Sequence, residues 1–403
     1  MPGPDQLPQL DGFGITFPFP IRVAVCLVAG FWGFAVNLHV LKKANIDVPS
    51  LIRYPARTSS QRPHHIAAYR LAAFFSVPIA TWYLIFLLAT HRSRELVEQL
   101  DFIPLSVFVI LLAILAWPYN RASRNGRIRL LKTLRRISIG GLAETQDGKF
   151  GDILLADALT SYSRVLGDLF VSFCMFFTYD ISATSKPDRQ CRKEFIVPLV
   201  VSLPSLIRFR QCLIEYIRAR RATSPAERGR ENQHLANALK YATALPMIWF
   251  APKLRFYTPK DFHGYSEMTM WRLLFFFTFV NSAYTFWWDV VKDWDLTLFS
   301  PDRISKDYPY GLRRHRCFSS YRVYHYAIAV DLALRFTWLW RMFPGLGWLP
   351  ETESGLFTLM MLEIFRRWMW VFFRIEAEWV RNTRGPVPDD VLLGDYNHKF
   401  DTD

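Results

Sequence analysis

The chain has 403 residues, of which 51% are hydrophobic and 16% aromatic, and its formal net charge at pH 7 is +14. A soluble enzyme of this size would divide into two or three domains with amphipathic patterning. Here the apolar residues instead gather in stretches of roughly 17–25 residues, the length that crosses a hydrocarbon core of about 30 Å. The composition therefore excludes an ordinary soluble enzyme and predicts an all-α polytopic membrane protein.

Nine membrane-spanning helices are expected in chain order. The first three are nearly free of charge, whereas the last six carry charged residues inside their apolar stretches. Asp157, Arg164 and Asp168 interrupt the fourth, and the sixth is short and begins at Lys240. The nine segments cover residues 19–41, 68–90, 102–119, 154–179, 195–217, 235–252, 268–292, 323–344 and 356–380.

The Lys and Arg content of the loops predicts the orientation. The loops and the tail on one side contain 27 of these residues, and the loops on the other side contain 9. The positive-inside rule places the more basic side in the cytosol, with the C-terminus there and the N-terminus outside it. The net charge is thus mainly a topology signal, and no nucleic-acid partner is expected.

The chain divides into five predicted parts. They are a short non-cytosolic N-terminus (1–18), three N-terminal transmembrane helices (19–120), a basic interfacial segment (121–150), a domain of six transmembrane helices (151–385) and a cytosolic tail (386–403). In the interfacial segment, basic residues alternate with apolar ones such as Ile128 and Leu131, which is typical of a helix in the plane of the membrane surface. The tail is rich in Pro and Asp and is a candidate docking peptide.

The five cysteines predict neither a disulfide framework nor a zinc site, because none of them forms a CxxC pair. The nine histidines form no HExxH or paired-ligand pattern. No metal centre of these kinds is expected. The cysteines are Cys26, Cys174, Cys191, Cys212 and Cys317.

Charged residues inside the last six helices are the main functional signal. A charge at mid-bilayer costs about 2.5–3.5 kcal/mol on insertion scales, so such residues usually face a bundle interior or a watery path. Arg side chains bind phosphate oxygens bidentately, and nearby carboxylates would keep the affinity low enough for release. We therefore expect these helices to form a bundle around an anion pathway. Its cations are Arg208, Lys240, Arg335, Arg366 and Arg367, and its carboxylates are Asp157, Asp289, Asp293 and Glu363.

Two other interpretations of these charges stay open. Asp331–Arg335 and Glu363–Arg367 have the i, i+4 spacing of intrahelical ion pairs, which would make them structural. Residues 289–293 form a D-x-x-x-D pattern that resembles a magnesium-binding motif of prenyltransferases. Only one such motif is present, and other oxygen ligands do not cluster near it in the sequence. No metal or other cofactor is therefore expected.

Several runs of the C-terminal part resemble the EXS-domain family, named for a yeast ER-retention protein, the xenotropic retrovirus receptor and a yeast signalling protein. The most specific run is FRRWMWVFFRIEAE, and two others are NSAYTFWWDVVKDWDL and ADALTSYSRVLGDL. The resemblance covers roughly residues 150–385 in the order and spacing of the family.

The resemblance also implies a set of phosphate-contacting residues. Thr160 stands where exporters of the family usually have Asn, so affinity or selectivity would differ there. Arg208 joins the set on its charge and its place in the fifth span. The other positions have the expected residue type: Asp157, Ser163, Lys240, Tyr241, Asp289, Asp293, Arg335, Trp338, Glu363, Arg366 and Arg367.

The best-known members of the family resemble phosphate exporters with an N-terminal SPX domain that senses inositol pyrophosphates. Only eighteen residues precede the first predicted span here, which is similar to the Golgi ER-retention-defective branch. The resemblance implies a transporter or channel that moves inorganic phosphate from the Golgi lumen to the cytosol. Such a protein would lie in the Golgi membrane rather than the plasma membrane, and would support glycosylation and retention of lumenal ER proteins.

Two alternatives belong to other classes. One is a scaffold that sorts Golgi enzymes through its tail and loops, and the other is a membrane-embedded enzyme that acts on a lipid-linked phosphate. We expect transport and no enzymatic activity. The expected partners are phosphate and membrane lipids, and a homodimer and Golgi enzyme-sorting proteins are further candidates.

Overall fold

The computed structural model shows an all-helical chain, which confirms the predicted class. Every regular element in the described residues is a helix, and no strand occurs among them. The structure describes residues 12–54, 63–118, 124–177, 184, 187–189, 195–223, 225–255, 266–299, 309–342 and 352–384. The predicted cytosolic tail therefore lies outside the described residues.

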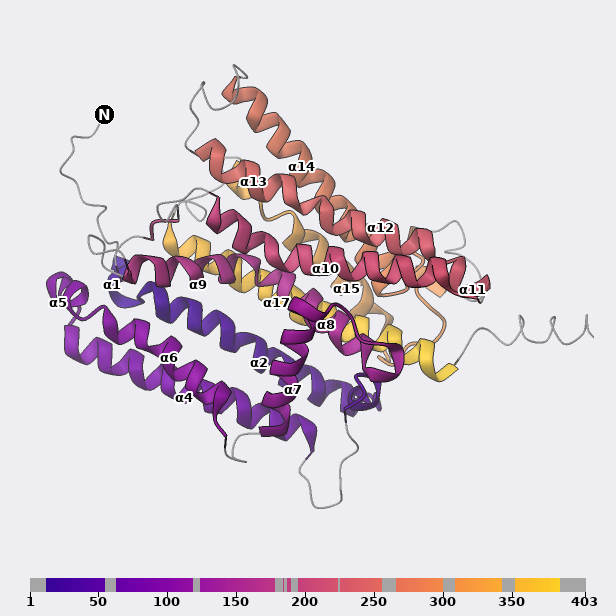
Figure 1. Ribbon diagram of the computed structural model, residues 1–403, viewed down its shortest axis with the longest axis horizontal. Coiled ribbons are helices and arrows are strands. Elements are labelled where there is room, and N and C mark those ends of the chain that lie inside the picture. Colours follow the sequence, from indigo (N-terminus) through magenta and orange to yellow (C-terminus); the bar gives the residue numbers. More distant parts are fainter. Residues whose placement is uncertain are drawn as a thin grey trace, which may run out of the picture.

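The N-terminal part forms a group of three long helices, α2, α4 and α6, that pack against one another (Figure 1). They correspond to the first three predicted spans, and their apolar composition explains why all three are continuous helices. Short helices lie before and between them. The elements are α1 (Gly12–Thr16), α2 (Phe19–Lys43), α3 (Val48–Leu51), α4 (His64–Thr90), α5 (Arg94–Gln99) and α6 (Phe102–Ala116).

The predicted interfacial segment contains the short basic helix α7 (Arg124–Arg135), the π-helix η1 (Arg136–Gly140) and the 3-10 turn η2 (Thr145–Asp147). Arg129 donates to the carbonyls of Ile52 and Arg53 at 2.7 and 2.6 Å. Arg136 is bonded to Asp152, and this hydrogen bond raises the pKa of Arg136. These bonds attach the segment to the residues that follow α3 and to the start of α8.

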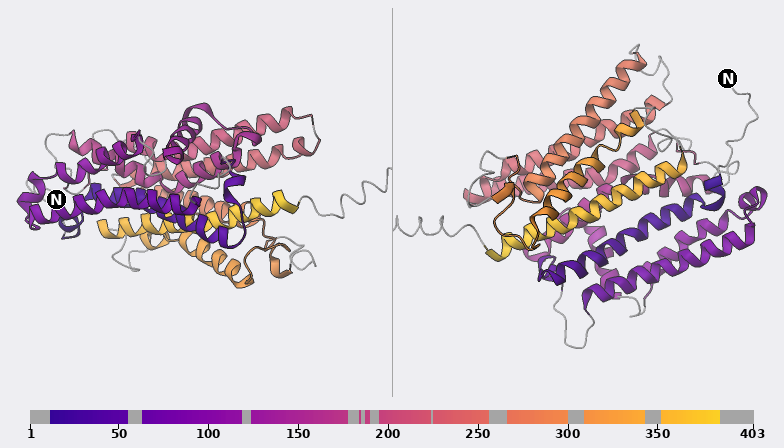
Figure 2. Two further views of the ribbon diagram at one scale, coloured as in Figure 1. Left: turned by 90° about the horizontal axis from the view of Figure 1, so that it is seen from below. Right: turned by 180° about the vertical axis from the view of Figure 1, so that it is seen from behind.

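The C-terminal part contains the remaining helices. The longest, α17, has 32 residues, which corresponds to about 48 Å, and it lies beside α2 (Figure 2). The elements are α8 (Lys149–Ser161), α9 (Ser163–Phe176), α10 (Ile196–Arg221), α11 (Pro225–Arg228), α12 (Glu231–Ala242), α13 (Ala244–Arg255), α14 (Glu267–Trp288), η3 (Asp289–Asp293), η5 (Pro309–Gly311), α15 (Tyr321–Arg335), α16 (Leu339–Met342) and α17 (Glu353–Arg384).

Three predicted spans are broken. The fourth consists of α8 and α9, separated at Tyr162; the sixth consists of α12 and α13, separated at Thr243. The eighth consists of α15 and α16, with residues 336–338 between them. A side-chain hydroxyl that bonds to a preceding carbonyl competes with the helical ladder, and each break has one. The bonds run from Ser163 to Thr160, from Thr243 to Lys240 and from Thr337 to Leu334.

A fourth irregularity lies at the end of the seventh predicted span. Residues Asp289–Asp293 form the π-helix η3, in which the amide of Trp294 donates to the carbonyl of Asp289 at 2.8 Å. Single π-turns are frequently found at functional sites. All four irregularities therefore fall next to residues that were predicted to form the anion pathway.

Four helical stretches of the described residues are long and apolar enough to cross a membrane. They match predicted spans one, two, three and five. Spans four, six and eight are divided into helices of at most 15 residues, and α17 carries many charges. The chain is thus a multi-pass membrane protein, while the count of nine spans stays a prediction. The four stretches are Phe19–Lys43, His64–Thr90, Arg94–Ala116 and Ile196–Arg221.

Close packing of α2 against α17 depends on glycine. A Cβ atom added at Gly33 would come within 2.9 Å of the Trp368 ring, and one at Gly30 would come within 2.3 Å of the Tyr162 hydroxyl. Tyr162 is the residue at which α8 and α9 separate. The two glycines therefore allow α2 to lie against both the charged part of α17 and a helix break.

Two hydrophobic clusters lie at different levels of α17. Met360 and Ile364 belong to one of them, and Trp370 and residues 371–373 belong to the other. Arg366 and Arg367 lie between these two clusters along α17. The apolar core thus positions the predicted site near the middle of the helix bundle.

The prediction of no disulfide framework does not hold for Cys174, which is disulfide-bonded. Cys26, Cys212 and Cys317 keep their thiol groups. Spacing along the chain carried no signal for this bond, because the cysteines form no local motif.

Candidate anion site

The first part of the site joins α8, α10 and α12. Arg208 on α10 donates through Nε to Asp157 Oδ1 at 2.7 Å and through Nη1 to Gln211 Oε1 at 2.6 Å. Tyr241 on α12 donates its hydroxyl to the same Asp157 oxygen. Arg208 and Asp157 are 2% and 3% exposed, so one buried carboxylate holds two helices against α8.

The second part joins α12, η3 and α17. Lys240 Nζ lies 3.5 Å from Asp293 Oδ2, and Arg374 Nε lies 3.9 Å from Asp293 Oδ1. The Lys240 ammonium also lies 4.7 Å from the ring centre of Tyr241 and 5.4 Å from that of Trp288. Aromatic faces attract cations at such distances, so Lys240 links this part to Tyr241.

The third part joins η3, α15 and α17. Arg335 bonds to Asp289 and, through Nε, to Asp331 at 3.0 Å. Arg366 Nη1 donates to Asp331 Oδ1 at 3.0 Å and lies 3.5 Å from Asp289 Oδ2. Two guanidinium groups and two carboxylates thus form an alternating set that connects three elements.

The fourth part joins α8 and α17 and differs from the others in its donors. Arg366 binds Glu363 through Nε and Nη2 at 2.9 and 2.6 Å. Ser161 donates to Glu363 Oε1 at 2.6 Å. The neighbouring Arg367 donates to two hydroxyls, to Ser161 at 2.9 Å and to Thr160 at 3.0 Å.

Arg367 is the unusual cation of the site. Among the described residues it forms no ion pair with a carboxylate, although it is half-buried. Its guanidinium lies 4.5 Å from the ring centre of Trp370. The Arg367 side chain is therefore fixed by neutral hydroxyls and an aromatic ring, and no carboxylate in the described part of the chain pairs with its positive charge.

Most of the predicted site residues are brought together in this connected set, but two are not bonded to its charged groups. The Ser163 hydroxyl donates to the Thr160 carbonyl at 2.8 Å. The Trp338 indole donates to Ser282 at 3.0 Å and packs against Phe275. Both residues lie at helix breaks. The residues within the set are Asp157, Thr160, Arg208, Lys240, Tyr241, Asp289, Asp293, Arg335, Glu363, Arg366 and Arg367.

One of the two intrahelical ion pairs that the spacing predicts is not formed. Asp331 and Arg335 do pair, but Glu363 pairs with Arg366, three residues away, instead of Arg367. Asp331 also pairs with Arg366 on another helix. Asp331 adds a fifth carboxylate to the set, and Arg374 adds a sixth cation.

Sequence reasoning missed Ser161, Thr285 and Arg374. Ser161 faces Glu363 because the helix ends there, whereas regular i, i+3 spacing from Asp157 selects Thr160 and then Ser163. Thr285 accepts from Arg335 Nη1 at 2.6 Å. The break at Tyr162, directly after Ser161, is the signal that would have identified Ser161, but it is not visible in the apolar pattern.

Asp289 and Asp293 each face cations, and no group of three or more His, Cys, Asp or Glu side chains suited to a metal ion occurs within the described ranges. Asp289 contacts Arg335 and Arg366, while Asp293 contacts Lys240. The two carboxylates therefore have different partners. This arrangement is typical of a salt-bridge network.

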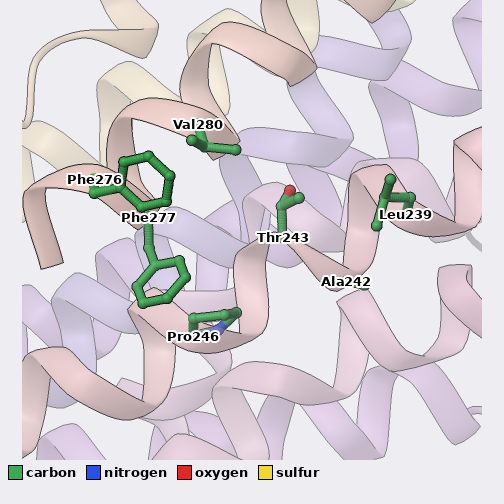
Figure 3. A pocket seen from close by; sticks show the side chains of 7 residues that line it. All are labelled: Leu239, Ala242, Thr243, Pro246, Phe276, Phe277 and Val280. Atoms are coloured by element: carbon green, nitrogen blue, oxygen red, sulfur yellow. The ribbon is translucent and has the colours of Figure 1, made fainter. Parts of the chain in front are cut away.

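A pocket of about 220 Å³ lies beside the charged set, at the break between α12 and α13 (Figure 3). Thr243 contributes the one hydroxyl among its lining residues and accepts from Asn281 at 2.9 Å. The remaining lining is apolar, so the pocket is unsuited to an anion. Its lining residues are Leu239, Ala242, Thr243, Pro246, Phe276, Phe277 and Val280.

The fold and the site define an all-helical, multi-pass membrane protein with a buried network of Arg, Lys, Asp and Glu side chains. The chain belongs to the EXS family, whose pattern matches residues 17–380. This confirms the family predicted from the sequence runs.

Three relatives show the range of similarity. Protein ERD1 homolog 1 of Schizosaccharomyces pombe is 30% identical over 380 residues, which cover 92% of this chain and 93% of that protein. Protein ERD1 of Kluyveromyces lactis is 32% identical over 249 residues, 59% of this chain and 61% of that protein. Solute carrier family 53 member 1 of Mus musculus is 27% identical over 373 residues, 90% of this chain but 50% of that protein.

Proposed function

We propose that this protein is a transporter or channel for inorganic phosphate, and that the charged set is its anion site. The observation that carries the proposal is Arg367, a guanidinium held by Ser161, Thr160 and Trp370 and paired with no carboxylate of the described residues. A planar guanidinium presents parallel N–H groups that match two oxygens of an oxyanion. Phosphate could therefore bind at Arg367 without first breaking an ion pair.

The surrounding carboxylates suit conduction rather than tight storage. Arg335 and Arg366 are already bonded to Asp289, Asp331 and Glu363. Their charge is therefore largely compensated, which lowers the attraction for a phosphate ion. Conduction requires binding that is strong enough for the ion to enter and weak enough for it to leave.

The broken helices support a pathway between the last six predicted spans. Irregular backbone at membrane depth is tolerated where it is buried in protein or lines a watery space, and discontinuous helices form the substrate sites of many transporters. Here the breaks at Tyr162 and Thr243 and the π-helix η3 all adjoin charged residues. The proposed division keeps nine spans, with residues 151–385 as the transport domain.

The proposed membrane is that of the Golgi, with transport from lumen to cytosol. Glycosyl transfer in the lumen releases nucleoside diphosphates, whose cleavage leaves phosphate that must return to the cytosol. The disulfide at Cys174 supports the orientation, because disulfides form in oxidising compartments. Cys174 lies near the end of α9 that the predicted topology places outside the cytosol. The similarity to ERD1 proteins and to a solute carrier agrees with this proposal.

Phosphate flux into proteoliposomes tests the proposal. The purified protein should take up labelled phosphate down its gradient, and protein-free vesicles of the same lipid should not. Uptake that persists with EDTA separates an anion pathway from a metal-dependent enzyme. No uptake by the folded protein, together with turnover of a lipid-linked phosphate or capture of Golgi enzymes, would favour one of the other two classes.

A further inference from the structure

A second ion-pair cluster lies outside the charged set, which is called the central site below, and the proposed function does not use this cluster. It consists of Arg22 on α2, Asp168 on α9, Arg189 and Glu353, the first residue of α17. Arg189 donates to both Glu353 oxygens at 2.8 and 3.0 Å and to Asp168 at 3.2 Å. Arg22 donates to Glu353 Oε2 at 3.2 Å. One carboxylate thus receives three N–H groups from two guanidinium groups.

Aromatic rings hold both guanidinium groups in place. Arg22 lies 5.1 Å from the ring centre of Phe13 and 5.3 Å from that of Phe19, and Arg189 lies 5.8 Å from that of Phe19. The Arg22 side chain is 3% exposed and the Glu353 side chain 10%. The donors would therefore keep their position if the Glu353 carboxylate moved away.

The cluster lies at one end of the bundle. The start of α2 and α1 lie at this end, with α5, and the end of α17 lies at the other (Figure 1). The predicted topology places this end on the non-cytosolic side. Phosphate that leaves the lumen would meet the cluster before the central site.

Arg164 continues the positive charge inward. It lies one helical turn before Asp168 on α9, it is exposed, and it forms no ion pair within the described part of the chain. Arg164 follows Ser163 at the start of α9, so it lies between the helix break beside Ser161 and the turn that carries Asp168.

We propose that Arg22 and Arg189 form a phosphate-binding site at the non-cytosolic mouth, and that Glu353 occupies it as a tethered competitor. A carboxylate and a phosphate ion use the same bidentate geometry with Arg, so an incoming phosphate replaces Glu353 bond for bond. Displacing Glu353 frees the start of α17, the helix that carries Glu363, Arg366 and Arg367. This proposal rests on the proposed phosphate transport.

The test compares variants in vesicles where the protein has one orientation, with phosphate offered to one face at a time. Glu353→Gln removes the competing charge and should lower the half-saturating phosphate concentration at the non-cytosolic face. If Glu353 holds the site about nine-tenths of the time, the decrease is about tenfold, because apparent affinity scales with the free fraction. Arg189→Gln should raise this concentration at the same face. Glu98→Gln is the control, since Glu98 forms an exposed pair with Arg94 on α5.

The double variant Glu353→Gln/Arg189→Gln distinguishes a binding site from a structural ion pair. It removes one charge of each sign, so a purely structural cluster should recover wild-type half-saturation in it. A mouth site predicts that it keeps the weak binding of Arg189→Gln. The proposal is overturned if Glu353→Gln and Arg189→Gln, both folded, leave half-saturation unchanged while the wild type transports. If Glu353→Gln does not fold, Arg189→Gln and the double variant decide. A folded wild type that moves no phosphate refutes both proposals.

Discussion

Replacing the two adjacent arginines of α17 should affect different properties, the stability of the fold at Arg366 and phosphate transport at Arg367. Arg366 is 3% exposed and bonded to Glu363 and Asp331, with Asp289 at 3.5 Å. Removing one partner of a buried ion pair typically costs about 3–5 kcal/mol, a large part of the roughly 5–15 kcal/mol that stabilises most proteins. Arg366→Gln should therefore fail mainly by loss of stability.

Arg367→Gln should instead lose transport while the fold survives. Its two hydroxyl partners keep other bonds, because Ser161 still donates to Glu363 and Thr160 to the Asp157 carbonyl. If phosphate loses one or two charge-assisted hydrogen bonds of about 1.5–3 kcal/mol each, its half-saturating concentration should rise at least about tenfold. Arg367→Lys should recover part of this loss, since the charge remains but the bidentate geometry does not.

The assay measures phosphate uptake against concentration in proteoliposomes, together with thermal unfolding of each purified variant. Arg381→Gln is the control, because Arg381 is 46% exposed and pairs only with Glu378 among the described residues. A stable Arg367→Gln protein with wild-type half-saturation would refute the assignment of Arg367 to the site. If Arg366→Gln were as stable as the wild type, the inference that Arg366 compensates the charges of Glu363, Asp331 and Asp289 would be refuted.

Three further outcomes are expected. Asp293→Asn removes the carboxylate 3.5 Å from Lys240, so phosphate should bind more tightly and leave more slowly. EDTA should change the phosphate flux of neither the wild type nor Asp293→Asn. A flux that stops in EDTA and returns with magnesium would contradict this. Ser161→Ala should raise the half-saturating phosphate concentration about threefold or more, because the bond to Glu363 is lost. The Ser163 hydroxyl bonds to a backbone carbonyl, so Ser163→Ala should stay close to wild type. Equal effects of the two variants would refute a special role of Ser161. A C-terminal tag should be cut by protease from the cytosolic side and an N-terminal tag should not, and tags on one side would mean an even number of spans.

The charged positions were predictable because each one interrupts an apolar stretch. Arg208, Lys240 and Asp289 stand out in any reading of the sequence, since burying a charge in a membrane helix is costly unless it has a partner. Their partners were less predictable. Helical spacing pairs Glu363 with Arg367, yet Glu363 bonds to Arg366, because the choice depends on Ser161 from another helix.

Helix breaks were the main source of error. The apolar pattern shows one span across residues 154–179, but the chain leaves the helix at Tyr162. This changes which residues share a face, so Ser161 contacts the charged set and Ser163 does not. The outer cluster was missed for a related reason. Arg22 and Glu353 are 331 residues apart, and no local pattern indicates that they meet.

The two clusters should control different steps of transport. At the mouth, phosphate must displace Glu353 from Arg22 and Arg189, so ion pairs are broken and formed in one exchange. At Arg367 no carboxylate of the described residues has to leave, and binding depends on the bidentate contact. A variant at the mouth should therefore act at the face where phosphate enters, whereas a variant of Arg367 should weaken binding from either face. The half-saturating phosphate concentration is therefore measured at both faces for Arg189→Gln and Arg367→Gln. If the two variants change it in the same way at each face, the two clusters act as one site.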